Sequence, residues 1–277
     1  MQYLTLKNGD HVPALGLGTW RMGEKASRAK DEVAALQRGI DLGMTLIDTA
    51  EMYGDGGAEQ VAGAAIHGRR DDVYLVSKVL PSNASRKGTI AACEASLRRL
   101  GTDRLDLYLL HWRGAHPLAE TMAAFLDLQQ AGKIRAFGVS NLDLADMQDW
   151  LAVSGAAATV VNQVQYSINS RGIDFDLLPW SIKQQIAVMA YCPLAQGDIP
   201  EGRVLQKIAA RHGATPAQIM LAWCLRSGHV IAVPKTSNPA RVAENAKAAD
   251  IRLSAEDLAE LDKDFPAPKR AESLAMT

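Results

Sequence analysis

Short apolar runs alternate with longer amphipathic stretches along most of this chain. Runs of four to seven mainly apolar residues without polar alternation predict strands buried on both faces, at 14–18, 44–48, 73–78, 105–111, 134–140, 159–163, 187–191 and 230–233. Apolar residues at helical spacing predict helices at 30–42, 57–67, 87–100, 118–131, 142–154, 175–185, 203–212, 216–227, 240–249 and 254–263. This order is typical of a parallel sheet whose faces are covered by helices.

Eight strand–helix units without a linker or low-complexity stretch predict an α/β fold, a closed (β/α)8 TIM barrel forming a single domain over 1–277. Asn8-Gly9 between short extended runs predicts an N-terminal β-hairpin, and the segment 254–263 predicts an extra C-terminal helix. A doubly wound open sheet is the alternative. It is disfavoured because Arg21 stands where the third glycine of a dinucleotide-binding turn should be in 16–21.

Charge and composition exclude several classes of protein. The 277 residues carry a formal net charge of −1 with scattered basic residues, so no nucleic-acid partner is expected. No apolar run approaches the ~20 residues needed to span a bilayer or resembles a signal peptide, so we expect no membrane partner and a soluble, cytoplasmic protein. We also expect it to be a monomer. Cys93, Cys192 and Cys224 form no CxxC pair, and we expect no metal site.

Four residues able to handle a proton occur where predicted strands stop. Asp48, Lys78 and His111 end the second, third and fourth strands, and Tyr53 lies in the loop after the second. The carboxyl ends of barrel strands meet at one rim, which is where active sites of this fold form. A nearby ammonium from Lys78 should lower the pKa of the Tyr53 phenol, and a carboxylate from Asp48 should keep that ammonium charged. His111 could then orient a substrate oxygen.

Each residue taken alone has a simpler interpretation. Asp48 and Lys78 could be a structural ion pair, Tyr53 a surface aromatic on a glycine-rich loop, and His111 a hydrogen-bonded structural histidine. The spacing of His111 and His116 matches no common metal-ligand pair. The occurrence of all four residue types at one predicted rim favours an active site over these separate interpretations.

The segments that carry these residues resemble the aldo-keto reductase family, with similarity from Gly16 to about Asn245. Residues 48–54, Asp-Thr-Ala-Glu-Met-Tyr-Gly, are similar to the family segment that supplies two members of its catalytic tetrad. Ser77-Lys78 and Leu110-His111 match the segments with the other two. The resemblance implies that Tyr53 is the general acid, that Lys78 and Asp48 tune it, and that His111 positions the carbonyl.

The same resemblance implies an NADPH (NADP+) site. Ser140, Asn141 and Gln163 match residues that hold the nicotinamide carboxamide, and Tyr191 matches the tyrosine that stacks on its ring; Cys192 stands where serine is usual. The full set of expected cofactor-binding residues is Gly18, Thr19, Trp20, Asp48, Ser140, Asn141, Gln163, Tyr191, Pro193, Leu194, Gln196, Gly197, Pro234, Lys235, Thr236, Ser237, Arg241, Glu244 and Asn245.

The segment near the eighth predicted helix also has an interpretation from its chemistry. Lys235 and Arg241 lie near the N-terminus of that helix, where free N–H groups and cations favour a phosphate. NADPH has a 2′-phosphate that NADH lacks, so we expect NADPH to be preferred, with Lys235, Thr236 and Arg241 as contacts. The alternative is a capped helix with two solvated cations.

Two departures from the family pattern bear on the substrate. No proline follows His111-Trp112, and both the loop 113–117 and the tail beyond Phe265 are short. Trp20, Tyr53, His111 and Trp112 should therefore line an open aromatic pocket suited to small aldehydes, 2-oxoaldehydes or compact ketones. The chain is most similar to bacterial family members assigned as methylglyoxal reductases.

The expected activity is NADPH-dependent reduction of such carbonyl compounds to alcohols, by hydride transfer with Tyr53 as general acid. Two other classes remain open at this point. Lys78 at a strand end could form an imine in a Schiff-base lyase if its pKa were depressed, although Asp48 opposes that. The chain could also be a non-catalytic subunit that senses NADPH.

Overall fold

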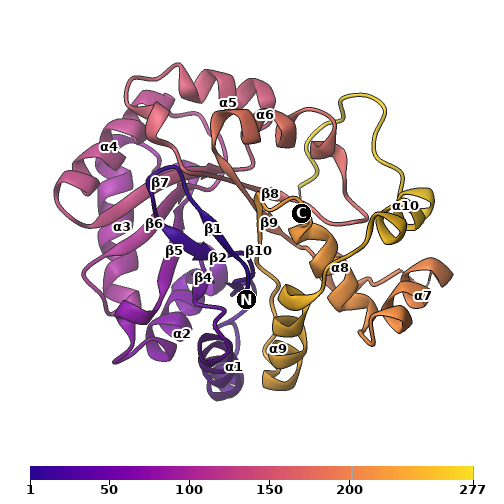
Figure 1. Cartoon of the computed structure of the whole chain (residues 1–277). Coiled ribbons are helices and arrows are strands. Elements are labelled where there is room, and N and C mark those ends of the chain that lie inside the picture. Colours follow the sequence, from indigo (N-terminus) through magenta and orange to yellow (C-terminus); the bar gives the residue numbers. More distant parts are fainter. Residues whose placement is uncertain (201, 277) are drawn as a thin grey trace.

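Eight parallel strands form a closed barrel in the computed structural model, which describes residues 1–200 and 202–276 (Figure 1). In sheet order the strands are β3 (Leu17–Gly18), β4 (Leu46–Asp48), β5 (Tyr74–Val79), β6 (Leu105–Leu110), β7 (Ile134–Ser140), β8 (Val161–Gln165), β9 (Ala187–Tyr191) and β10 (Val230–Ala232). A parallel bridge between Leu15 and Ala232 joins the two ends of this sheet. The predicted TIM barrel is confirmed, and the doubly wound open sheet is wrong because these two edges pair with each other.

Helices surround the barrel, as Figure 1 shows. Their bounds are α1 (Ala29–Asp41), α2 (Gly57–Ala65), α3 (Arg86–Leu100), α4 (Leu118–Gln130), α5 (Leu144–Leu151), α6 (Leu177–Gln184), α7 (Arg203–Arg211), α8 (Pro216–Leu225), α9 (Pro239–Ala246) and α10 (Ala255–Asp264). Each predicted helix is present with shifted ends. The α5 helix begins later than predicted because the Asp143 carboxylate caps it, accepting from the Asp146 N–H at 2.8 Å. No described helix is both long and apolar enough to cross a membrane.

The predicted N-terminal hairpin closes one end of the barrel. Its strands β1 (Tyr3–Thr5) and β2 (His11–Pro13) are antiparallel and cross the front of the barrel in Figure 1. The turn residue Asp10 accepts a hydrogen bond from Tyr74 and pairs with Arg135, which lie at the starts of β5 and β7. The hairpin therefore covers the N-terminal ends of the strands and leaves their C-terminal ends open.

The closing seam of the barrel requires a close approach of two backbones. The Gly18 N–H donates to the Pro234 carbonyl at 3.0 Å, and a Cβ at Gly18 would lie 2.7 Å from the Val233 oxygen. Only glycine fits there without movement of the chain. The contact brings the first and last βα connections together at the C-terminal rim.

A buried carboxylate joins the helix after the Tyr53 loop to the strand that carries Lys78. The Glu59 carboxylate on α2 is fully buried, accepts from the Ser77 hydroxyl at 2.6 Å and pairs with Arg99 of α3 at 2.5 Å. Since α2 follows Tyr53 and Ser77 precedes Lys78, this contact holds the tyrosine loop in register with β5.

We expect Glu59→Ala to lower the free energy of unfolding by about 3 kcal/mol, because Ser77 and Arg99 lose a buried partner. Asp41→Ala is the control, since Asp41 pairs with Arg69 at the surface and its loss should cost less than about 1 kcal/mol. Urea unfolding of both variants provides the measurement. Equal effects would show that the Glu59 pair is no more important than a surface pair.

Candidate active site

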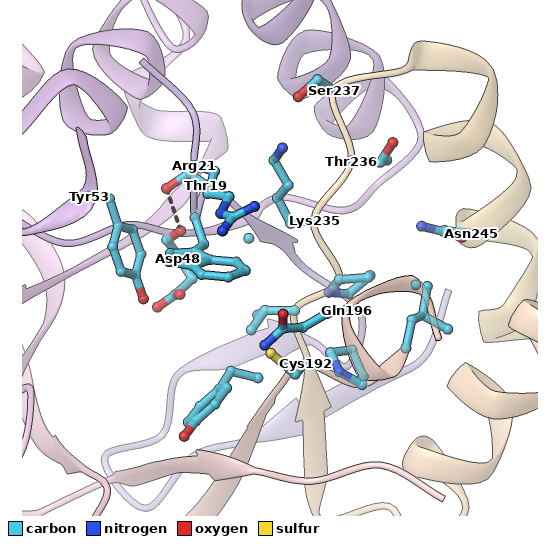
Figure 2. Close-up of a pocket in the computed structure, with 18 of the residues that line it drawn as sticks. Thr19, Arg21, Asp48, Tyr53, Cys192, Gln196, Lys235, Thr236, Ser237 and Asn245 are labelled. Atoms are coloured by element: carbon cyan, nitrogen blue, oxygen red, sulfur yellow. Dashed lines mark hydrogen bonds between the residues drawn. The ribbon is translucent and has the colours of Figure 1, made fainter. Parts of the chain in front are cut away.

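The four rim residues meet around one buried ammonium group. Lys78 is fully buried, and its Nζ lies 2.8 Å from Asp48 Oδ1. The same Nζ donates to the Thr49 carbonyl at 2.8 Å and to the Tyr53 hydroxyl at 3.3 Å. Figure 2 shows Asp48 and Tyr53 side by side in this pocket. The structure thus brings the acid, the amine and the phenol into direct contact.

The ion pair decides the charge of the amine. Burial lowers the pKa of Lys78, but the negative charge of Asp48 and the contact with Tyr53 raise it more, so the net pKa lies above its ordinary value. Lys78 is therefore an ammonium at neutral pH. An ammonium donates hydrogen bonds but is not a nucleophile.

Lys78 lowers the pKa of Tyr53 as predicted, but the net pKa of this phenol is raised. Burial raises the pKa of this phenol above its ordinary value, and the opposing effect of Lys78 does not cancel it. Asp48 raises the pKa further, because the carboxylate that keeps Lys78 charged also disfavours a phenolate. The phenol stays protonated at neutral pH, which is the form that can give up a proton.

His111 follows β6 directly and is only 5% exposed. Its ring meets Tyr53 edge-on, with centroids 5.8 Å apart, and lies 4.9 Å from the Trp112 ring. Burial and the charge of Lys78 lower the pKa of His111 to about 2, so the imidazole is neutral. Nδ1 is buried with no hydrogen-bond partner among the described residues. A neutral imidazole is suited to orient a polar atom rather than to supply charge.

A groove of about 970 Å³ passes over these residues. Every residue expected to bind the cofactor lines it, as do Trp20, Tyr53, His111 and Trp112, which are expected to contact the substrate. Lys78 lies beneath the groove, behind Tyr53. The structure thus gathers segments from all along the sequence around one elongated cavity.

A polar cluster occupies the wall next to Asp48. The Ser140 hydroxyl donates to the Gln163 carbonyl at 2.9 Å, and the Asn141 amide donates to Ser140 Oγ at 3.1 Å. The Tyr191 hydroxyl donates to Asn141 Oδ1 at 2.9 Å, while Gln163 Nε2 donates to Asp48 Oδ1 at 2.8 Å. These bonds orient the amides at this end of the groove before any ligand binds, and link them to the ion pair.

The connection after β9 bends sharply around the groove. Cys192, Ala195 and Gln196 have φ values of 50°, 46° and 58°, in the left-handed region that costs energy for residues other than glycine. Figure 2 shows Cys192 and Gln196 close together on this side of the cavity. The strained turn is expected where a loop has to wrap a ligand.

The opposite end of the groove is cationic. Lys235, Arg241, Arg21 and Arg28 line it, and the Ser237 hydroxyl is buried there with no partner among the described residues. Burial lowers the pKa of Lys235, and the charge of Arg28 adds to this effect, while Glu32 and Glu24 partly oppose it. Cations gathered in this way fit a ligand with several phosphates, and a dinucleotide matches both ends of the groove.

Sequence reasoning missed part of the lining. The additional residues are Arg21, Arg28, Met52, Ile199, Ala217, Val233, Asn238 and Met276. Arg21 and Met52 directly adjoin Trp20 and Tyr53 in the sequence, so their position beside expected site residues could have identified them. Met276 comes from the tail, whose path over the groove no local pattern predicts. Among the described residues no group of three or more metal-ligating side chains occurs.

The depressed pKa of His111 predicts a loss of stability in acid. Between pH 6.5 and about 2 the unfolded chain binds a proton at this residue that the native protein does not, so stability falls as the pH drops. From about pH 7.5 to about pH 5, we expect the wild type to lose about 2 kcal/mol more than His111→Gln. Urea unfolding at both pH values, with exposed His67→Gln as control, measures this; equal losses in wild type and His111→Gln would contradict it.

Comparisons with known proteins agree with this geometry. The Aldo/keto reductase family model matches residues 14–264. Methylglyoxal reductase YeaE of Escherichia coli is 54% identical, over 96% of this chain and 95% of its own length. Glyoxal reductase of Bacillus subtilis is 36% identical, over 93% and 90%. An aldo-keto reductase from Klebsiella pneumoniae, crystallised with NADPH, superposes with a TM-score of 0.97 at 50% identity, covering 100% of this chain and 99% of its own. This chain belongs to the aldo-keto reductase family.

Proposed function

We propose that this chain acts as one barrel domain over 1–277 and reduces small aldehydes, 2-oxoaldehydes such as methylglyoxal, or compact ketones to alcohols. As a family member it is an NADP-dependent oxidoreductase. The observation that carries the proposal is the 3.3 Å contact between Lys78 Nζ and the Tyr53 hydroxyl at the floor of a groove shaped for a dinucleotide. The similarity to two reductases of 2-oxoaldehydes and dialdehydes supports this substrate class.

The groove would hold NADPH, which would supply a hydride for the carbonyl carbon. Tyr53 donates its phenolic proton to the carbonyl oxygen as negative charge develops there. Lys78 hydrogen-bonds to the phenol and stabilises the phenolate that remains, and Asp48 keeps Lys78 charged and aimed. His111, neutral and in edge contact with Tyr53, positions the carbonyl oxygen.

The two ends of the groove hold the two ends of the cofactor in this proposal. Ser140, Asn141 and Gln163 bind the carboxamide, and Tyr191 stacks on the nicotinamide ring. The segments 193–197 and 234–237 lie along the pyrophosphate and the adenosine end. Arg241, Glu244 and Asn245 of α9 complete that end.

The substrate pocket is open and apolar. Trp20 and Met52 are 36% and 39% exposed at its mouth, and Trp112 and Met276 also line the groove. Few polar side chains besides Tyr53 and His111 are available there to select a large polar substrate. A small carbonyl compound therefore suits the pocket better than a large rigid one.

Imine chemistry at Lys78 is disfavoured. A Schiff-base lyase needs a neutral amine, whereas Asp48 and Tyr53 keep Lys78 charged.

We also propose a cytoplasmic monomer. The buried thiols of Cys93 and Cys224 suit a reducing compartment.

We expect Tyr53→Phe to lower kcat about 10³-fold with methylglyoxal and NADPH, because the proton donor is lost. The affinity for NADPH should stay unchanged, since phenylalanine keeps the aromatic ring of Tyr53. Steady-state kinetics and a cofactor-fluorescence titration measure both, with Tyr3→Phe, an exposed hairpin tyrosine, as control. Full kcat in Tyr53→Phe would refute the acid role. A wild type without turnover across an aldehyde, ketone and sugar panel would favour a cofactor-sensing subunit instead.

The preference for NADPH has its own test. Arg241→Ala should weaken NADPH binding about tenfold and leave NADH binding unchanged, because a charge-assisted contact to the 2′-phosphate is removed. Lys247→Ala is the control, since Lys247 is exposed beyond the other end of α9. An Arg241→Ala protein with the wild-type KM for NADPH would show that this guanidinium does not contact the phosphate.

A further inference from the structure

The connection between β3 and α1 faces the connection between β10 and α9 across the cationic end of the groove. Arg21 and Arg28 line the groove from the first connection, and Lys235 and Ser237 line it from the second. Neither Arg28 nor Lys235 forms an ion pair with a carboxylate in the described part of the chain. Two cations from distant parts of the sequence therefore line one cavity without an ion pair, although Arg28 is exposed and the charges of Glu32 and Glu24 also act on Lys235.

The loop that carries Arg28 is fixed in place. The Gly23 N–H donates to the buried Glu32 carboxylate at 2.9 Å, and Gly23 has a φ of 76°. A Cβ at Gly23 would lie 2.2 Å from the carbonyl carbon of Gly57, so this loop packs directly on the start of α2. These contacts fix the Gly23 end of the connection that leads to Arg28, whose own side chain is exposed.

Arg28 has no evident structural role. It occupies the N-cap position of α1 and makes no capping hydrogen bond. Serine, threonine, asparagine or aspartate would stabilise α1 there, and a cation opposes the dipole of α1 at this end, although Arg28 also ends the preceding 3-10 helix (Ala26–Arg28), where a cation is favourable. Asp31 and Glu32 in the first turn offset part of this cost. A cation that makes no capping hydrogen bond but lines a ligand groove points to a role in binding.

The charge of Arg28 acts on the adenosine end of the groove. Its effect on the pKa of Lys235 is second only to burial and larger than that of Arg21. Arg21 instead lies over the Trp20 indole, with its guanidinium carbon 4.6 Å from the ring centroid. An anion bound beside Lys235 would relieve the repulsion from Arg28, and the unpartnered Ser237 hydroxyl could donate to it.

We propose that Arg28 binds the 2′-phosphate of NADPH from the side opposite Lys235 and Arg241, and so contributes to the preference for NADPH over NADH. This inference rests on the proposed function of the chain. It makes the first βα connection, as well as the last, a part of the phosphate site.

The experiment is a set of binding titrations with NADPH, NADH, 2′,5′-ADP and 5′-ADP, on the wild type, Arg28→Ala and Lys25→Ala. Lys25 is exposed, precedes the same short 3-10 turn and does not line the groove, so it controls for loss of a nearby charge. For Arg28→Ala we expect binding of NADPH and 2′,5′-ADP to weaken about tenfold, with NADH and 5′-ADP unchanged. Lys25→Ala should match the wild type.

Two results would overturn the inference. Unchanged NADPH affinity in Arg28→Ala would show that the side chain makes no phosphate contact. An equal loss for NADPH and NADH would place Arg28 on the pyrophosphate. A wild type that binds neither dinucleotide would instead refute the proposed function itself, so the two failures are distinguishable.

Discussion

The Lys78 ammonium and its three oxygen partners are the interaction on which the rest of the site depends. This ammonium is fully buried, and taking an unpaired charge out of water would cost several kcal/mol. Asp48 neutralises it, and the Thr49 carbonyl and Tyr53 hydroxyl use its remaining protons. These partners are the last residue of β4 and the loop after it, so satisfying the ammonium also sets where the phenol lies.

Closure of the barrel accounts for the shape of the groove. Because the segment just before β3 pairs with β10 through Leu15 and Ala232, the connections after the first and last strands lie next to each other, although more than 200 residues separate them in the sequence. The first supplies Trp20 and Arg21 and the second supplies Lys235. An open sheet would place these connections at opposite edges. The elongated cavity, polar at one end and cationic at the other, therefore follows from the topology.

The same burial has opposite consequences for the three titratable groups around the floor of the groove. It raises the pKa of Tyr53, lowers that of His111, and lowers that of Lys78 until Asp48 reverses the effect. The result is a protonated phenol that contacts both a neutral imidazole and a charged amine. Tyr53 can then donate the proton, His111 can orient the substrate oxygen, and Lys78 can stabilise the phenolate that remains.

Local patterns in the sequence determined the strands, most of the helices, the hairpin and the fold class, because a barrel strand buried on both faces and an amphipathic helix have distinct periodicities. The residue types at the strand ends also determined which side chains meet at the rim.

Helix ends such as that of α5 were displaced because capping by Asp143 depends on single hydrogen bonds. Only the tertiary structure decided the direction of the Tyr53 pKa, because desolvation depends on what covers the phenol. It also decided that Arg28 and Met276 line the groove, since long-range packing, which leaves no periodic signal, places them there.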